Sequence, residues 1–309
     1  MTTLDRRRFL AISAGVLAAT GLPADASVPL HQWRGVAMGA DASITLAHPQ
    51  AEEIVARALA EIARLEAVFS LHHAESALVR LNRDGVLEAP PFELLECFAL
   101  CGRVHAATGG MFDPTIQPLW ALHAESHAAG VKPSDKAIAD TLARTGWDGV
   151  GYDSASVRLA RPGMALSLNG VAQGFVADRV VEMLAAQGLT DILVNTGEYR
   201  ALGGHPAGGG WPVTLSDGER LIPDAISLRD MAVASSAPHG ITFDADGRES
   251  HVIDPTTGRP APARWRLVSV AAPQAGVADA LGTAFCLMER DQIETALAAF
   301  PSARIVHLG

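Results

Sequence analysis

The stretch SLNGVAQGFVADRVVEMLAAQGLTDILVN, residues Ser167–Asn195, decides the fold, because it joins a glycine-containing turn, a helix and a buried strand. The segment Val171–Gln187 is predicted to be helical, and Gly188 is the residue type at which helices commonly stop. The apolar run Asp191–Val194 that follows is typical of a buried strand. Helix and sheet are therefore expected to pack together.

Further helices are predicted on both sides of this segment. Ala51–Phe69 places its apolar residues on one stripe and most of its charges off it, which is the pattern of an amphipathic helix. Ser134 and Asp291 are expected to be N-caps of two more helices. Besides Val171–Gln187, the predicted helices are Ala51–Phe69, Phe92 to about Ala107, Ser134–Arg144, Ala278–Met288 and Gln292–Phe300.

Strands are predicted mostly after the glycine-rich middle of the chain. The dipeptide Asp246-Gly247 predicts a hairpin turn between two short β-like runs. The predicted strands lie around Val213, Ile226, Val233, Ile241 and Val252, and at Leu267–Ala271. Together with the helices, this pattern predicts an α+β fold in which helices flank largely antiparallel sheets.

The N-terminus has the pattern of an export signal. Residues 6–8 are three arginines, the apolar stretch after them continues to Thr20, and the small residue Ala26 suits cleavage. Residues 1–26 are therefore interpreted as a signal peptide of the twin-arginine type, with an ordinary Sec signal as the alternative. Residues 27–309 are then expected to form a single periplasmic domain without a membrane span.

Composition argues against a nucleic-acid partner, and cysteine spacing argues against a disulfide. The formal net charge of −10 argues against binding to nucleic acid. Cys97 and Cys101 are four residues apart on a predicted helix, where the geometry for a disulfide is poor. They are interpreted as buried free thiols.

Two patterns could hold a phosphate or a cation. The turn Ser167–Gly174 opens a helix, so its free N–H groups favour phosphate and a carbonyl outside the first turn can face a cation. Asp279 and Thr283 are four residues apart, and a carboxylate and a hydroxyl on one helix face suit Mg²⁺. Each pattern also has a structural explanation: a packing turn for the first, and helix capping by a first-turn Asp279 for the second.

His251 begins a strand that runs into a turn closed by Pro255 and Gly258. A histidine at a strand end could shuttle a proton or donate to a phosphate, and it could equally be structural. The residue alone leaves both interpretations open.

Six motifs follow one another in a fixed order along the chain. They are Met38-Gly39; Phe69-Ser70-Leu71-His72 with Ser76 and Arg80-Leu81-Asn82; Thr108–Thr115 with Pro118-Leu119; Asn195, Gly197 and Arg200; His251–Gly258; and Ala278–Thr283. In this order they resemble the ApbE family of FAD:protein FMN transferases, over essentially the whole mature chain. The resemblance implies a T-fold-like arrangement of helices and sheets.

The resemblance also implies a site and a reaction. Mg²⁺ would be held by the side chains of Asp279 and Thr283 and by the backbone carbonyls of Gly170 and Gly282. The implied FAD contacts are Met38, His72, Met111, Phe112, Asp113, Ser167, Gln173 and Ile253. The FMN half of FAD would move to a threonine or serine hydroxyl of an acceptor flavoprotein subunit of a membrane redox complex, releasing AMP. Asp279 and His251 are both candidates for the base that takes the hydroxyl proton.

The chain departs from the family pattern at several of these positions. Ser167 stands where the family usually has Asp, Gln173 where it often has Lys or Glu, and His72 where Tyr is common. Thr196-Gly197 replaces a Gly-Gly pair, and residues 235–237 replace Thr-Ser-Gly. We therefore expect altered FAD affinity with binding retained. The alternatives are an FAD pyrophosphatase giving FMN and AMP, and a non-catalytic periplasmic FAD carrier or assembly factor.

Overall fold

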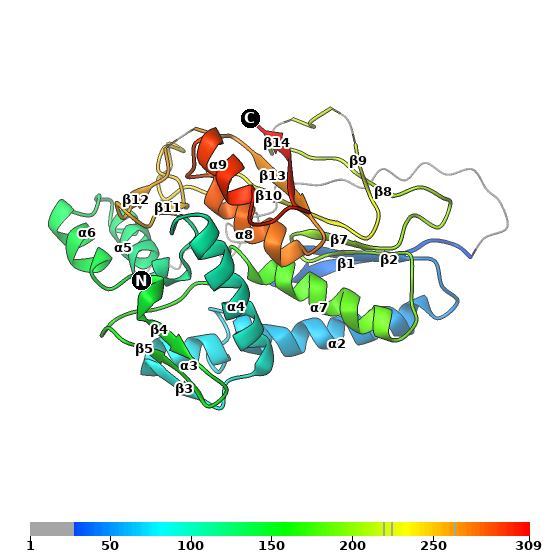
Figure 1. The fold of residues 1–309 in the computed structure, drawn as a ribbon, viewed down its shortest axis with the longest axis horizontal. Coiled ribbons are helices and arrows are strands. Elements are labelled where there is room, and N and C mark those ends of the chain that lie inside the picture. The colour runs from blue at the N-terminus through cyan, green and yellow to red at the C-terminus, as the bar shows by residue number, and fades with distance from the viewer. Residues whose placement is uncertain (1–27, 219, 224, 263) are drawn as a thin grey trace.

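A seven-stranded antiparallel sheet forms the centre of the molecule (Figure 1). The computed structural model describes residues 28–309 except 219, 224 and 263, so the predicted signal peptide lies outside the described residues. The strand order is β1-β2-β6-β7-β10-β13-β14. The strands are β1 His31–Ala37, β2 Ala40–Leu46, β6 Ile192–Asn195, β7 Tyr199–Leu202, β10 Ala232–Ser236, β13 Val268–Ala272 and β14 Arg304–Leu308.

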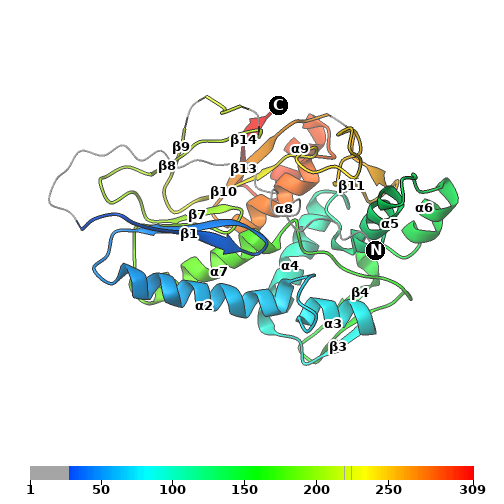
Figure 2. The ribbon, with the colours of Figure 1, turned by 180° about the vertical axis from the view of Figure 1, so that it is seen from behind.

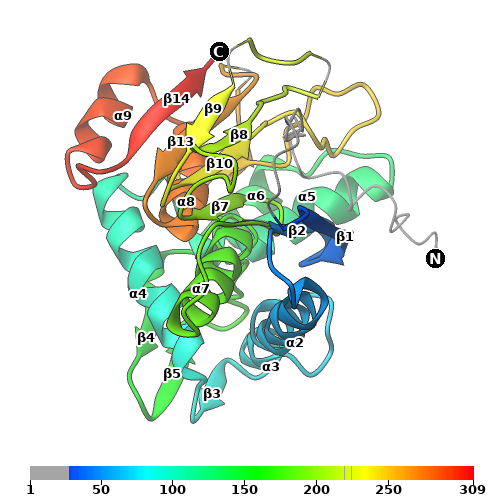
Figure 3. The same cartoon turned by 90° about the vertical axis from the view of Figure 1, so that its right-hand side faces the viewer.

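Alternation along the strands divides the core between the two faces of this sheet. On β6, Ile192 and Val194 join the large core cluster and Leu193 joins a second cluster. Side chains on a strand alternate between faces, so β6 contributes to both. Helices cover the first face and the β8–β9 hairpin covers the other (Figure 3). These elements are α2 Ala51–Phe69, α4 Phe92–Ala107, α7 Ala172–Ala186, α8 Ala275–Phe285, β8 Trp211–Val213 and β9 Ile226–Leu228.

Smaller elements complete the chain at the ends of this core. Helices α5 and α6 and the β11–β12 pair gather at one end of the molecule, which Figure 2 shows from behind. The smaller elements are α3 Ala77–Asp84, α5 Gln117–Ala128, α6 Asp135–Leu142, α9 Arg290–Leu297, β3 Val86–Glu88, β4 Val150–Tyr152, β5 Ser156–Leu159, β11 Ile253–Asp254 and β12 Arg259–Pro260, with 3-10 turns at Pro114–Ile116 and Trp147–Gly149. Within the described residues, no helix is both long and apolar enough to cross a bilayer.

Helices α7 and α8 pack backbone against backbone. A Cβ atom on Gly174 of α7 would lie 2.4 Å from the carbonyl oxygen of Ala275, so only glycine allows this approach. Asp178, one turn further along α7, accepts hydrogen bonds from the N–H groups of Ala275 (2.8 Å) and Gly276 (2.9 Å), and pairs with Arg200 (3.1 Å). The carboxylate of Asp178 therefore caps the start of α8 from a neighbouring helix.

The predicted α+β class is confirmed, and most predicted helices are found with small shifts at their ends. Helix α8 begins at Ala275, three residues earlier than predicted, because the cap comes from a distant residue. Asp279 therefore lies in the second turn, and the interpretation of it as a helix cap is wrong. Glu289, and not Asp291, is the N-cap of α9, in a capping box with Gln292.

Two further differences concern strands. The run around Ile241 forms no strand, and the predicted hairpin is reduced to a single bridge between Thr242 and Ser250. The carboxylate of Asp244 accepts the N–H groups of Arg248 and Glu249 and so organises that loop. Several elements were not predicted: α3, α5, β1, β3, β4, β5, β7, β12 and β14. The interpretation of Cys97 and Cys101 as buried free thiols is confirmed.

The contact between α7 and α8 can be tested by adding one methyl group. Gly174→Ala should lower the free energy of unfolding by about 2 kcal/mol, because the new Cβ overlaps backbone that cannot move without separating the helices. Urea unfolding followed by circular dichroism measures the change. Gly151→Ala is the control, because its Cβ would meet open space. Equal stability of the two variants would contradict the prediction.

Candidate active site

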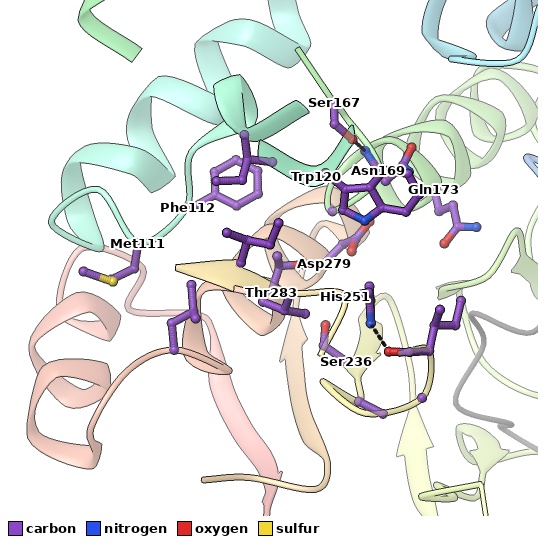
Figure 4. A pocket seen from close by; sticks show the side chains of 18 of the residues that line it. Met111, Phe112, Trp120, Ser167, Asn169, Gln173, Ser236, His251, Asp279 and Thr283 are labelled. Atoms are coloured by element: carbon purple, nitrogen blue, oxygen red, sulfur yellow. Dashed lines mark hydrogen bonds between the residues drawn. The ribbon is translucent and has the colours of Figure 1, made fainter. Parts of the chain in front are cut away.

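A cavity lies between the turn that opens α7, helix α8, the β6–β7 turn and the loop that precedes β11 (Figure 4). Of the residues predicted for the site, ten line this cavity: Met111, Phe112, Asp113, Ser167, Gly170, Gln173, His251, Ile253, Asp279 and Thr283. Three do not: Met38, His72 and Gly282. Segments between Met111 and Leu287 thus meet at one place.

The glycine turn and α8 are in direct contact. A Cβ on Gly170 would lie 2.8 Å from the Oγ1 atom of Thr283, so the turn leaves space that the threonine hydroxyl occupies. A Cβ on Gly282 would lie 3.2 Å from the Oγ atom of Ser236 at the end of β10. The backbone of the turn, the Thr283 hydroxyl and the end of β10 therefore surround a small space beside Asp279.

Asp279 is an acidic group held in an apolar setting. Its side chain accepts one hydrogen bond, from the N–H of Gly174 (3.2 Å), and the residue is 4% exposed. Burial raises the pKa of Asp279 to about 7, and the nearby charge of Asp178 acts in the same direction. The carboxylate is thus available to bind a cation at neutral pH and is costly to keep ionised without one.

Glu198 is a second buried acid in the cavity, and it was not predicted. It follows the β6–β7 turn, is 8% exposed, and accepts the N–H of Ser235 (3.0 Å) through Oε2. Burial and the negative charge of Asp279 raise the pKa of Glu198 well above its ordinary value. One signal was present in the sequence: a glutamate between Gly197 and Arg200, within the motif that begins at Asn195.

The cavity is acidic and has no lysine or arginine among its described lining residues. Two of its four acids have local partners: Asp113 accepts the N–H and hydroxyl of Thr115, and Asp217 pairs with Arg266 at 3.4 Å. Asp279 and Glu198 have no cationic partner among the described residues. The charge of the cavity is therefore concentrated in this pair.

His251 is a neutral base in the cavity wall. Its Nδ1 atom lies 2.9 Å from the carbonyl oxygen of Ile241 (Figure 4). Because a carbonyl can only accept, Nδ1 carries the proton and Nε2 of the neutral ring is an acceptor. Burial lowers the pKa of His251, which keeps the ring neutral at physiological pH.

The remaining predicted residues hold the cavity together or lie at its edge. Ser167 donates its N–H to the carbonyl of Pro114 (2.8 Å), which ties the segment with Met111 and Phe112 to the glycine turn. Gln173 donates to the carbonyl of Met38 (3.3 Å), so Met38 reaches the site through a cavity residue. His72 lies in an exposed turn away from the cavity lining.

A sequence model of the ApbE family matches residues 38–305. The chain belongs to the ApbE family. It is 28% identical over 268 residues to the FAD:protein FMN transferase of Haemophilus influenzae, covering 82% of this chain and 76% of that protein. It is 32% identical over 262 residues to the enzyme of the same name from Treponema pallidum, covering 76% and 71% of the two chains.

Solved structures agree with this assignment. The ApbE protein of Thermotoga maritima superposes with a TM-score of 0.79 at 26% identity, covering 91% of this chain and 94% of that one. The flavinyl transferase ApbE of Pseudomonas stutzeri gives a TM-score of 0.77 at 25% identity, covering 90% of each chain. The ApbE-like architecture predicted from the sequence motifs is therefore confirmed.

The raised pKa of Asp279 predicts a pH-dependent stability of the metal-free protein. The unfolded chain ionises this carboxyl near its ordinary pKa of 3.8 and the folded chain near 7, so stability from this group is complete below about 4 and is lost as pH rises through 7. Asp279→Asn should therefore raise the unfolding free energy at pH 8, by an amount on the order of 3 kcal/mol, and not at pH 4.

Thermal unfolding of the metal-free proteins across pH 4–8 measures this difference. Asp140→Asn is the control, because Asp140 is an exposed surface partner of Lys136. If the curves of the wild type and Asp279→Asn stayed parallel across this range, Asp279 would titrate normally and the argument from burial would be wrong.

Proposed function

We propose that this ApbE-family flavin transferase moves the FMN moiety of FAD to a threonine or serine hydroxyl of an acceptor flavoprotein in a Mg²⁺-dependent reaction that releases AMP. The observation that carries the proposal is the pair of buried acids, Asp279 and Glu198, in a cavity whose described lining contains no lysine or arginine. A pyrophosphate could not bind beside them unless a cation offset the combined negative charge. The names of the curated relatives support the same reaction.

The residues present fit Mg²⁺ better than a transition metal. No group of three or more His, Cys, Asp or Glu side chains suited to a metal occurs in the described part of the chain. A carboxylate, a hydroxyl and backbone carbonyls are the oxygen donors that Mg²⁺ prefers, with water and phosphate completing its shell. Asp279, Thr283 and the carbonyls of Gly170 and Gly282 would hold the ion, which when bound would offset charge on the pyrophosphate.

The chain's own residues bring the reactants together and receive the proton. The N–H groups of the glycine turn favour the phosphates, as at other helix starts. The acceptor oxygen forms a bond to the phosphorus of the FMN half, and the bond from that phosphorus to the bridging oxygen breaks, so AMP leaves. We assign the hydroxyl proton to Nε2 of His251, because Asp279 is committed to the cation and His251 is neutral.

We propose that the reaction takes place in the periplasm. Three arginines at residues 6–8, followed by an apolar stretch, support export to the periplasm by the twin-arginine route. An exported flavin transferase would meet the periplasmic parts of membrane redox complexes, and we propose a flavoprotein subunit of such a complex as the acceptor.

One assay separates this function from its alternatives. The purified protein is incubated with FAD, Mg²⁺ and an acceptor domain, and protein-bound flavin and free AMP are measured. We expect both products together, and neither after chelation with EDTA. AMP formed equally without an acceptor would instead indicate a pyrophosphatase, and FAD binding without either product would indicate a carrier.

The role of His251 can be tested separately from binding. His251→Gln should still bind FAD, because the amide can keep a hydrogen bond to the Ile241 carbonyl, but transfer should slow about 10²- to 10⁴-fold. Because burial lowers the pKa of His251 from 6.5, wild-type transfer should persist as pH falls to 6.5 and decline below it. Unchanged transfer by the variant would remove His251 from the chemistry.

The cation site can be tested at the turn. Gly170→Ala keeps the backbone carbonyl and places a methyl group against Thr283, so Mg²⁺ should bind at least about 10-fold more weakly while the fold is retained. Isothermal titration measures the affinity, and Gly151→Ala, outside the cavity lining and with open space for its Cβ, controls for the loss of glycine flexibility. Equal affinity in Gly170→Ala and the wild type would exclude Thr283 and the turn as joint ligands.

A further inference from the structure

Hydrogen bonds to α7 and β10 hold the β6–β7 turn and the carboxylate of Glu198 in place. The hydroxyl of Thr196 donates to the carbonyl of Gln173 (2.8 Å), which attaches the β6–β7 turn to α7. Gly197 has φ +109, and a Cβ there would lie 2.5 Å from the Gln173 side chain. The positive φ of Gly197 therefore favours glycine in this turn. Glu198 follows it and lines the cavity, where the N–H of Ser235 holds one of its oxygens.

The chain shows how it stabilises a buried acid that has only a structural role. Asp178 accepts two backbone N–H groups and pairs with Arg200, so its charge is offset within the protein. Glu198 has a single N–H partner and no cationic partner among the described residues, and it lines the same cavity as a second buried acid, Asp279. Two such groups destabilise a folded protein unless something outside the chain offsets them.

We propose that Glu198 is the second acidic group of the cation site, so that Glu198 and Asp279 together supply the two negative charges that one Mg²⁺ balances. The inference rests on the proposed function and adds to the cation site a residue from the segment between β6 and β7. It makes the β6–β7 turn part of the cation site, in addition to the glycine turn and α8. Glu198 is thus a residue that binds or balances the ion, and it takes no proton in the transfer.

If Glu198 has this role, Glu198→Gln should raise the stability of the metal-free protein and lower its affinity for Mg²⁺. Glutamine keeps the size of the side chain and an oxygen for the Ser235 N–H, and removes the charge. The metal-free variant should be more stable than the wild type at pH 8, because a buried like-charge pair is gone. Its affinity for Mg²⁺ should fall about 10- to 100-fold, because half of the balancing charge is gone.

The experiment measures metal binding and stability without relying on activity. Mg²⁺ is titrated calorimetrically, and Mn²⁺ by paramagnetic resonance, into the wild type and Glu198→Gln, each with and without FAD. Thermal unfolding is followed with EDTA and with Mg²⁺. Asp217→Asn is the matched control: it removes another cavity carboxylate, but one that already has Arg266 as its partner, so metal affinity should stay within about 3-fold of the wild type.

The outcomes distinguish this inference from the function on which it rests. A wild type that binds neither metal ion, with or without FAD, would overturn the proposed metal dependence itself. A wild type that binds and a Glu198→Gln variant that binds equally well would overturn only the role of Glu198. A Glu198→Gln variant that unfolds more easily in EDTA would also contradict it, because that result assigns Glu198 a structural role.

Discussion

The site depends on one contact, the backbone-to-backbone packing of α7 on α8. Gly174 allows the approach, and Asp178 fixes it by capping α8 from outside that helix. This contact sets the position of the turn before α7 relative to the second turn of α8, and so brings Gly170 against Thr283. Two segments more than 100 residues apart in the sequence become one surface because two helices have no side chain between them.

The same packing explains why the acids of the site are buried. Asp279 lies on a helix that is buried along almost its whole length, so its carboxylate enters the cavity with little access to water. Glu198 enters from the sheet side under the same conditions. The low dielectric constant of the buried surroundings raises the free-energy cost of each negative charge. It also strengthens the attraction between each charge and a cation. Under the proposed function, the charges that lower the stability of the metal-free protein would be the ones that attract the cation.

Much of this could be predicted from the sequence, and the failures have a common cause. Helices such as α2 were predicted well because amphipathic periodicity is local information. The start of α8 was misplaced because its cap, Asp178, lies 97 residues away from Ala275. Strand β1 was missed because a mixture of partly buried and exposed residues, such as exposed Val36, hides the alternation.

The site shows the same limit. Asp279 and Thr283 were predicted because i, i+4 spacing places them on one helix face, and motif order predicted the family. Glu198 was missed because its importance depends on which side chains surround it, and a sequence of strand, turn and strand does not reveal that. Met38 and His72 were predicted as flavin contacts from motif matching, and they lie outside the cavity lining. Whether either residue contacts the flavin stays a prediction, because a contact would require FAD to extend beyond the cavity lining.

The departures from the family pattern acquire a physical meaning in this setting. Ser167 and Gln173 are neutral at positions where the motif resemblance leads us to expect charge, and both side chains bond to backbone: the Ser167 hydroxyl accepts the N–H of Asn169, and Gln173 donates to the carbonyl of Met38. Neither adds charge to the cavity, and His251 is kept neutral by burial. The electrostatics of the described site therefore reduce to one acidic pair, so under the proposed function a single divalent cation would be enough to change the cavity from one that repels a pyrophosphate to one that can accept it.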